Sequence, residues 1–205
     1  MIRRGHSAIA AATAAARSAS LAFCLGLIGL TGAAVFAFLP DKAPVGVPSV
    51  GGPFTLVNQD GRTVTERDFA GATHLVFFGF THCPDVCPTT LQQISDVLAA
   101  LGPKGKAMRV AFVTVDPERD DPASLKAYLS SFDPRITGLT GTPEQVTATE
   151  KAYRAYARKV PAKDGDYTME HTALVYVMDA QNRFLGALDL TRPADEVAAQ
   201  LAKKI

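Results

Sequence analysis

The chain contains no tryptophan, only three cysteines, and no acidic residue before Asp41. Because residues 1–40 carry three arginines and no acid, the overall net charge of +1 leaves residues 41–205 with a net charge of −2. This second part has no stripe of lysine or arginine, which argues against a nucleic-acid partner. A length of 205 residues fits one domain with short additional segments.

One long run without charge lies near the N-terminus, at residues 21–39 (LAFCLGLIGLTGAAVFAFL). As a helix with a rise of about 1.5 Å per residue it would be about 28 Å long, close to the thickness of a bilayer core. Three arginines precede the run, and no lysine or arginine follows it until Lys42. This asymmetry predicts a cytoplasmic segment at 1–20, a transmembrane anchor at 21–39 and export of the rest of the chain.

Two other interpretations of the N-terminus stay open. Residues 35–37 (VFA) form a passable cleavage site for a signal peptide, although the apolar run is long for one. The alanine-rich, arginine-containing start is also compatible with a mitochondrial presequence. We therefore expect a bacterial inner-membrane protein whose domain faces the periplasm, with the mitochondrial inner membrane and the intermembrane space as the alternative. Cys24 follows Phe23 rather than the small residue of a lipoprotein site, so it is expected to be a packed apolar residue.

Residues 40–53 are rich in proline, glycine and valine and show no periodicity, which predicts a linker. From residue 54 to 205, strand patterns alternate with helical patterns. This order predicts an α/β domain of the thioredoxin-like fold, with a central mixed sheet flanked by helices and an N-terminal hairpin. The expected elements are strands at 54–57 and 62–65 joined by an Asp60-Gly61 turn, a buried strand at 74–80, a helix at 88–101, a strand at 108–115, helices at 122–132 and 143–158, strands at 172–178 and 184–189, and a helix at 193–204.

Two cysteines follow the buried strand, in the stretch GFTHCPDVCP (79–88). If the helix begins near them, Cys83 and Cys87 are four residues apart and share one face of it. The free N–H groups and the positive dipole end of a helix stabilise a thiolate relative to a thiol. Pro84 suits an early helical position, where its missing N–H is not needed. The pattern therefore predicts a pair of activated thiols at an exposed edge.

Two such thiols can exchange disulfides or hold a soft metal ion. A purely structural disulfide would close a loop of five residues and stabilise the fold little. Three residues separate the cysteines where oxidoreductases of this fold have two, and the wider spacing favours chelation without forbidding a disulfide. Zinc prefers four ligands, and the sequence offers three good candidates. Copper in either oxidation state suits two thiolates and an imidazole.

The third ligand must be one of four histidines. His6 lies on the other side of the predicted membrane, and His74 begins the buried strand, where a core or edge position is expected. His82 adjoins Cys83, but neighbours at a strand end point apart, so it is expected near the site rather than on the metal. His171 precedes the strand predicted at 172–178, and in a thioredoxin fold the loop entering that strand faces the cysteine motif. His171 is therefore the predicted ligand, with a solvent-exposed loop histidine as the alternative.

From about Gly51 to the C-terminus the chain resembles the Sco/SenC family of copper chaperones. The cysteine motif with its flanks is the most specific part of the resemblance, because a bare C-x-x-x-C would be weak evidence. The resembling stretches are FGFTHCPDVCPTTL (78–91), VDPERD (115–120), Y-x-x-x-H-T (167–172), GGPF-x-L (51–56), Asp60-Gly61 and GLTGT (138–142).

The resemblance implies a thioredoxin-like domain that holds one copper ion, as Cu(I) or Cu(II), through Cys83, Cys87 and His171. It implies a role in assembling the binuclear copper centre of cytochrome c oxidase. The implied partners are the oxidase subunit that carries this centre, an upstream copper donor and, through the anchor, the membrane. The chain would then be a metallochaperone rather than an enzyme.

Three further residues belong to the predicted site. Asp85, between the cysteines, is assigned by the resemblance to the surface offered to partners or to the surroundings of the metal, where His82 is also expected. Asp116 in VDPERD ends a core strand at the same edge, and a loop-fixing or helix-capping carboxylate is its plain interpretation. The alternative function is a thiol–disulfide oxidoreductase that reduces client cysteines through a redox disulfide between Cys83 and Cys87. A peroxidase of this fold is disfavoured, since its characteristic residues and any tryptophan are missing.

Overall fold

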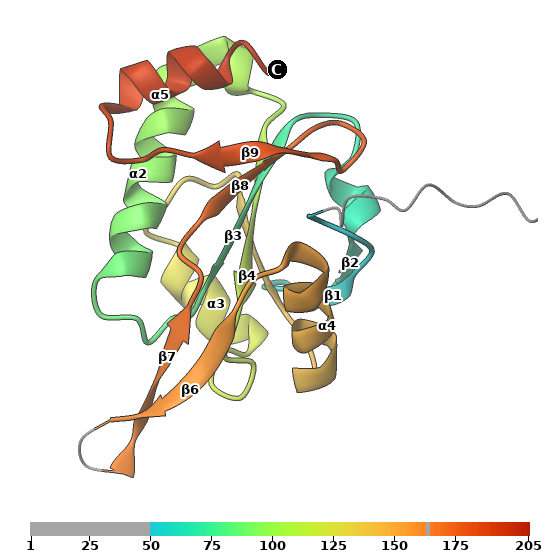
Figure 1. Ribbon diagram of the computed structural model, residues 1–205, viewed down its shortest axis with the longest axis vertical. Helices are drawn as coiled ribbons and strands as arrows, with labels where there is room; N and C mark the ends of the chain where they lie inside the picture. Colours follow the sequence, from blue (N-terminus) through green and yellow to red (C-terminus); the bar gives the residue numbers. More distant parts are fainter. Residues whose placement is uncertain (1–49, 163–164) are drawn as a thin grey trace, which may run out of the picture. The chain divides into compact units, whose positions relative to one another are not determined.

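The computed structural model describes residues 50–162 and 165–205, and Figure 1 shows their arrangement. The predicted cytoplasmic segment, the transmembrane anchor and residues 40–49 of the predicted linker lie outside the described residues. Within the described part, no helix combines the length and the apolar character needed to cross a membrane.

A mixed sheet of seven strands forms the centre of the domain, in the order β2-β1-β5-β4-β3-β8-β9. β3, β4 and β5 run parallel, while β1, β8 and β9 join the sheet through antiparallel pairs. A separate two-stranded sheet, β6-β7, extends away from it (Figure 1). The strands are β1 (Thr55–Asn58), β2 (Thr63–Thr65), β3 (His74–Gly79), β4 (Arg109–Thr114), β5 (Ile136–Thr140), β6 (Ala157–Pro161), β7 (Tyr167–His171), β8 (Val175–Met178) and β9 (Phe184–Leu188).

Among the described residues, four α-helices accompany the sheet, and the starts of two of them follow from the sequence. Asp121 and Thr142 cap the starts of α3 and α4 through side-chain oxygens, and a proline follows each of them at the first helical position. α2 connects β3 to β4 and packs against α5. The helices are α2 (Val86–Leu101), α3 (Pro122–Leu129), α4 (Pro143–Tyr153) and α5 (Ala194–Leu201).

The continuous apolar run at 74–80 becomes the central strand β3, which is buried along its whole length. Successive side chains of a strand point to opposite faces of the sheet. Phe77 packs against Phe112 of β4, with ring centroids 5.9 Å apart, on the side of α2. Phe78 packs against Tyr153 of α4 at 5.6 Å. β3 therefore joins two apolar layers, and its carboxyl end carries the cysteine motif.

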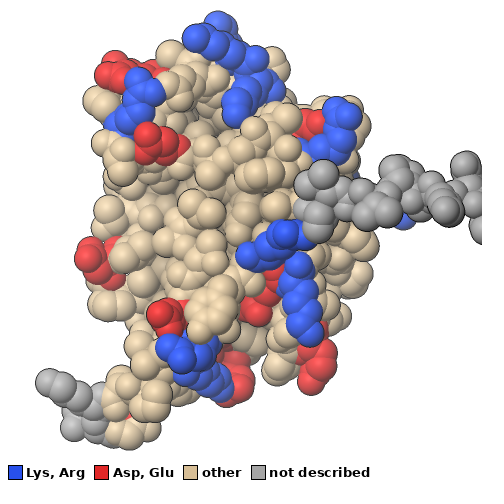
Figure 2. All heavy atoms as spheres, viewed as in Figure 1, with Lys and Arg blue, Asp and Glu red and all other residues tan. Residues whose placement is uncertain are grey.

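The surface of the domain carries charges of both signs. On the face drawn in Figure 2, small groups of basic and acidic side chains lie around an uncharged central area. The ion pairs of the domain include Arg158 with Glu170 and Arg192 with Glu196.

The predicted mixed α/β architecture, the N-terminal hairpin and the antiparallel last two strands are confirmed. The prediction missed β5 (Ile136–Thr140), because ITGLT is short and has a glycine at its centre, which weakens a strand pattern. Gly138 is required there by packing: a Cβ atom at this position would lie 2.6 Å from Leu129 of α3.

The helix predicted at 143–158 is wrong over its last five residues. α4 ends at Tyr153, because Arg154 adopts a left-handed conformation (φ 54°) and caps the helix. β6 begins at Ala157 and pairs with β7, so His171 is the last residue of a strand and not part of a loop. The strand predicted at 172–178 accordingly begins only at Val175. The β6–β7 hairpin was not predicted because its sequence lacks the apolar pattern of a core strand. None of the residues assigned to β6 and β7 is buried.

Glu150, on α4, gives the fold a pH dependence. Burial raises the pKa of its carboxyl group from 4.5 to about 7. The folded protein therefore holds this proton more tightly than the unfolded chain, and stability falls as pH rises through the window between these two values. We expect Glu150→Gln to be more stable than the original protein at pH 8, by about 1 kcal/mol after allowance for solvent screening, with no difference at pH 4. Denaturant unfolding at both pH values measures the effect.

Glu144, on the first turn of the same helix, provides the control. A hydrogen bond from Thr142 lowers the pKa of Glu144, the opposite direction to Glu150. Glu144→Gln should therefore gain no stability at pH 8. An equal gain in both variants would show that burial of Glu150 is not the cause.

Candidate metal centre

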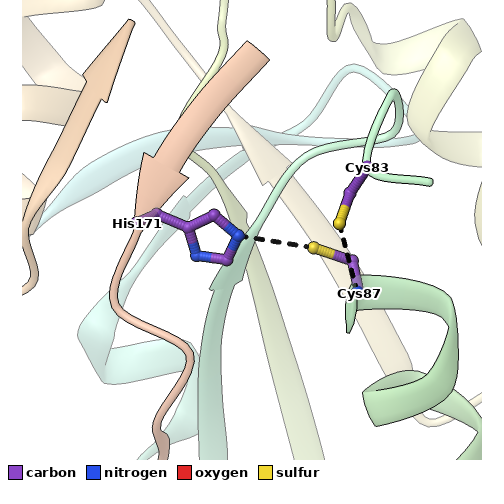
Figure 3. Close-up of side chains that lie close together, drawn as sticks. All are labelled: Cys83, Cys87 and His171. Carbon is purple, nitrogen blue, oxygen red and sulfur yellow. Dashed lines mark hydrogen bonds between the residues drawn. The ribbon is translucent and has the colours of Figure 1, made fainter. Parts of the chain in front are cut away.

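Cys83, Cys87 and His171 meet at the carboxyl end of β3, although Cys87 and His171 are 84 positions apart in the sequence. Each offers one ligand atom, and these atoms all lie within 4.8 Å of one another. Figure 3 shows both sulfurs and the imidazole facing a common point, with the cysteines coming from the start of α2 and the turn before it and the histidine from the end of β7. The structure thus brings together the three residues predicted as ligands.

The spacing predicted that the two cysteines share one face of a helix, and this prediction is wrong. α2 begins at Val86, so Cys83 and Pro84 lie in the turn that precedes it, and Asp85 is the N-cap residue. The turn bends back because the N–H of Cys83 donates to the carbonyl oxygen of Phe80 (3.3 Å). The N–H of Cys87, one of the free donors at the helix N-terminus, donates to Sγ of Cys83 at 3.2 Å. A hydrogen bond across the helix start therefore brings the sulfurs together.

The prediction of two exposed, activated thiols is wrong for Cys87. Its side chain is fully buried, whereas Cys83 is half-buried. Burial, and next a side-chain hydrogen bond between this thiol and that of Cys83, raise the pKa of the Cys87 thiol. Both cysteines are free thiols. In the metal-free protein Cys87 is therefore protonated at neutral pH, and a bound cation would have to displace its proton.

His171 presents a nitrogen lone pair to the sulfurs. Its Nδ1 lies 3.1 Å from the carbonyl oxygen of Thr172, and because a carbonyl only accepts, Nδ1 carries the proton of the neutral ring. Nε2 is then the free acceptor, and it lies 3.6 Å from Sγ of Cys87. Burial lowers the pKa of His171, which keeps the imidazole neutral. The ring of Phe80 meets it edge-on, with centroids 5.7 Å apart. The neutral ring with a free Nε2 is the state in which an imidazole binds metals.

Among the described residues, the other predicted site residues lie outside this group. His82 is exposed, and its Nδ1 lies 3.1 Å from Oγ1 of Thr81. Asp85 is exposed at the helix start, and its side chain makes no capping hydrogen bond. His74 is buried as the first residue of β3, at the end of the strand away from the cysteines, as expected of a core histidine.

Asp116 is fully buried, so it cannot belong to a surface offered to partners. Its carboxylate accepts hydrogen bonds from Nε of Arg119 (2.5 Å) and from the hydroxyl of Tyr167 (2.8 Å). Burial and this hydrogen bond raise the pKa of Tyr167 to about 12. Asp116 is thus the loop-fixing carboxylate of the plain interpretation, while the helix cap belongs to Asp121.

The sequence analysis missed two residues that shape the site, Asp120 and Gly79. Asp120 is fully buried and accepts hydrogen bonds from Thr81 and Thr114. A Cβ atom on Gly79 would lie 2.6 Å from Phe112 and 3.0 Å from Sγ of Cys87, so only glycine lets the buried sulfur approach the strand. The signal for both was present, because they lie in the quoted stretches VDPERD and FGFTHC.

Fold and site together define a class: a thioredoxin-like domain with two cysteines and one histidine arranged as a site for a single soft metal ion. The family model described as SCO1/SenC matches residues 42–205. The chain therefore belongs to the SCO1/SenC family.

Two curated relatives show the range of this family. The protein SCO1, mitochondrial, of Saccharomyces cerevisiae is 43% identical over 146 residues, which cover 70% of this chain and 50% of the relative. The protein SenC of Rhodobacter capsulatus is 38% identical over 149 residues, covering 73% of this chain and 67% of SenC. The chain spans about half the length of the first mitochondrial relatives it matches (48%, 57% and 54%).

Solved structures agree with the fold. Bradyrhizobium japonicum ScoI, solved with copper bound, has a TM-score of 0.74 and 51% sequence identity, and covers 77% of this chain and 100% of its own. BsSco, described as a member of the Sco family of cytochrome c oxidase assembly proteins with a disulfide switch, has a TM-score of 0.61 and 25% identity, and covers 77% of this chain and 94% of its own.

Proposed function

We propose that this chain is a copper chaperone that holds one copper ion through the sulfurs of Cys83 and Cys87 and Nε2 of His171. The observation that carries the proposal is the convergence of these three ligand atoms within 4.8 Å. Thiolate and imidazole are ligands that suit copper, whereas a structural zinc site would be completed by a fourth protein ligand. The copper-bound state of ScoI, at 51% identity, supports the same metal here.

Copper is the cargo in this proposal, so the site must also release it. Cys83 and His171 are only half-buried, and an incoming thiolate or imidazole of a client can approach the ion from their side. Ligand exchange then transfers the ion without a free intermediate. Oxidation of Cys83 and Cys87 to a disulfide would remove two of the three ligands, which makes the redox state of this pair a control of binding.

The client in this proposal is the subunit of cytochrome c oxidase that carries the binuclear copper centre, and an upstream donor supplies the ion. Support comes from the description of BsSco as one of the oxidase assembly proteins. The proposed division of the chain is a cytoplasmic segment (1–20), an anchor (21–39), a linker (40–53) and the copper-binding domain (54–205). The anchor would hold the domain in the periplasm at the bacterial inner membrane and raise its local concentration near a membrane-bound client.

Copper titration and transfer test the proposal together. The reduced purified protein should bind one equivalent of copper, and the protein with a Cys83–Cys87 disulfide should bind none tightly. The loaded protein, mixed with the metal-free oxidase domain that carries the binuclear centre, should generate the optical absorption of that centre. Tight binding by the oxidised protein, or failure of transfer from a fully loaded chain, would reject the chaperone function.

A second candidate function is reduction of client cysteines. It is favoured by the free state and the proximity of Cys83 and Cys87, and by the disulfide switch described for BsSco. In this reaction the two thiols would become a disulfide while the client disulfide takes up two electrons and two protons. Cys83, the more accessible sulfur, would attack first. A dithiol reductase needs no imidazole, so His171 separates the two functions.

A further inference from the structure

The hairpin β6–β7, which ends in His171, is weakly attached to the rest of the domain. Its strands form their own two-stranded sheet, and the residues assigned to them are exposed or half-buried. Figure 1 shows the hairpin extending beyond the edge of the seven-stranded sheet. Apolar contact with the core is limited to half-buried residues, namely Ala157, Met169 and the edge of His171 against Phe80. Polar contacts must therefore contribute to fixing the position of the histidine.

Tyr167 makes the main connection between the hairpin and the core. It lies four residues before His171, so the two side chains are on the same face of β7. The Tyr167 hydroxyl donates to Oδ1 of Asp116 at 2.8 Å. The guanidinium of Arg119 lies over the Tyr167 ring, 3.8 Å from its centroid, and donates to the Tyr167 carbonyl oxygen at 3.1 Å. Asp116 and Arg119 together thus hold the ring, the hydroxyl and the backbone carbonyl of Tyr167.

The acceptor of this connection is rigid. Asp116 lies two residues after the end of β4 and has no exposed surface, and its N–H donates to Oγ1 of Thr114 (2.9 Å). Arg119 compensates its buried charge through a hydrogen bond of 2.5 Å. An ion pair with a fully buried carboxylate favours one geometry, because breaking it would leave the charge of Asp116 unpaired inside the protein.

The same segment also holds the cysteine turn. Four residues after Asp116, the carboxylate of Asp120 accepts hydrogen bonds from the backbone N–H (3.0 Å) and the hydroxyl (2.6 Å) of Thr81. Thr81 begins the turn that carries Cys83. One short stretch, Asp116–Asp120, is therefore bonded to both halves of the metal site.

We infer that the Asp116–Asp120 segment sets the distance between His171 and the two sulfurs, with Tyr167 as the positioning residue for the histidine. This inference rests on the proposed copper site and explains what the VDPERD stretch contributes to it. Removing a group that positions a metal ligand typically lowers metal affinity about 10- to 100-fold.

Tyr167→Phe removes only the hydroxyl that reaches Asp116. We expect the purified variant to release copper to a chelator about tenfold faster than the original protein, with altered spin-resonance parameters of bound Cu(II). Tyr156→Phe is the matched control, because Tyr156 precedes β6 and is 52% exposed. The control should leave release unchanged; equal release from all three proteins, or an equal effect of both substitutions, would overturn the inference.

A double-mutant cycle shows whether Tyr167 acts through the histidine. In the His171→Ala background, the remaining sulfurs can still bind Cu(I), and Tyr167→Phe should now have no effect on its affinity. An undiminished effect there would mean that Tyr167 only stabilises the fold, and the inference would fail.

A metal-free measurement separates this inference from the copper proposal. In NMR spectra of the metal-free protein, Tyr167→Phe should shift or broaden the ring resonances of His171, and Tyr156→Phe should not. Unchanged His171 resonances in Tyr167→Phe would overturn the positioning role even if copper binds. Shifted resonances in a protein that binds no copper would support it and reject the chaperone function.

Discussion

Replacing His171 by alanine should weaken copper binding by at least about 100-fold, since one of three ligands is lost. Among the described residues, no other histidine, cysteine or carboxylate belongs to this group and could replace the imidazole. The effect should be largest for Cu(II), because imidazole nitrogen suits it better than a site of two thiolates alone. His171 makes little contribution to the core, being half-buried, so the variant should remain folded. Competition with a chelator of known affinity measures the loss.

His82→Ala is the control for this experiment. His82 adjoins Cys83, but its side chain is 54% exposed and its Nδ1 faces Thr81. Copper affinity should stay within about twofold of the original, a difference below about 0.5 kcal/mol. A dithiol reductase would show another pattern: His171→Ala would keep full activity towards a client disulfide, and copper binding would be irrelevant to it. If copper affinity fell in His82→Ala and not in His171→Ala, the assignment of His171 as the ligand would be wrong.

Asp120→Ala should be the most destabilising change near the site. The substitution leaves three donors without their acceptor, namely the N–H and hydroxyl of Thr81 and the hydroxyl of Thr114, in a region where Asp120 has no exposed surface. Each buried unsatisfied group costs about 1–3 kcal/mol. The Thr114 hydroxyl is fully buried and the two Thr81 donors are partly buried, so we expect a total loss of about 3 kcal/mol in the free energy of unfolding. Denaturant unfolding of the metal-free protein measures it.

The neighbouring Asp121 provides a matched comparison. It caps α3 by accepting the N–H of Ser124 at 2.7 Å, and it is exposed. Asp121→Ala should therefore cost only about 1 kcal/mol, the usual loss for an N-cap residue. Similar losses in the two variants would contradict the assignment of Asp120 as a buried anchor of the cysteine turn.

Hydrophobic periodicity was a reliable guide to the core and a poor guide to the hairpin that carries His171. The strand at 74–80 and the helix ending at Leu101 are apolar enough to be recognised, and both were predicted. β6 (ARKVP) and β7 (YTMEH) are held by Tyr167, Asp116 and Arg119 instead, and such long-range polar contacts leave no periodic trace in the sequence.

The candidate site was predicted in composition but not in environment. Spacing and residue type indicated two sulfurs and an imidazole. The burial of Cys87 was hidden, because it depends on Gly79 allowing the sulfur to approach β3 and Phe112. The consequence is chemical: the buried thiol keeps its proton until a cation replaces it, so the two sulfurs of the site are not equivalent.

X-ray absorption at the copper edge of the protein loaded with one equivalent tests most directly whether these side chains hold the ion. The account predicts two sulfur neighbours and one imidazole nitrogen, with the nitrogen lost in His171→Ala and one sulfur lost in Cys83→Ser. A copper ion surrounded by oxygen and nitrogen alone, or a spectrum unchanged by both substitutions, would contradict it.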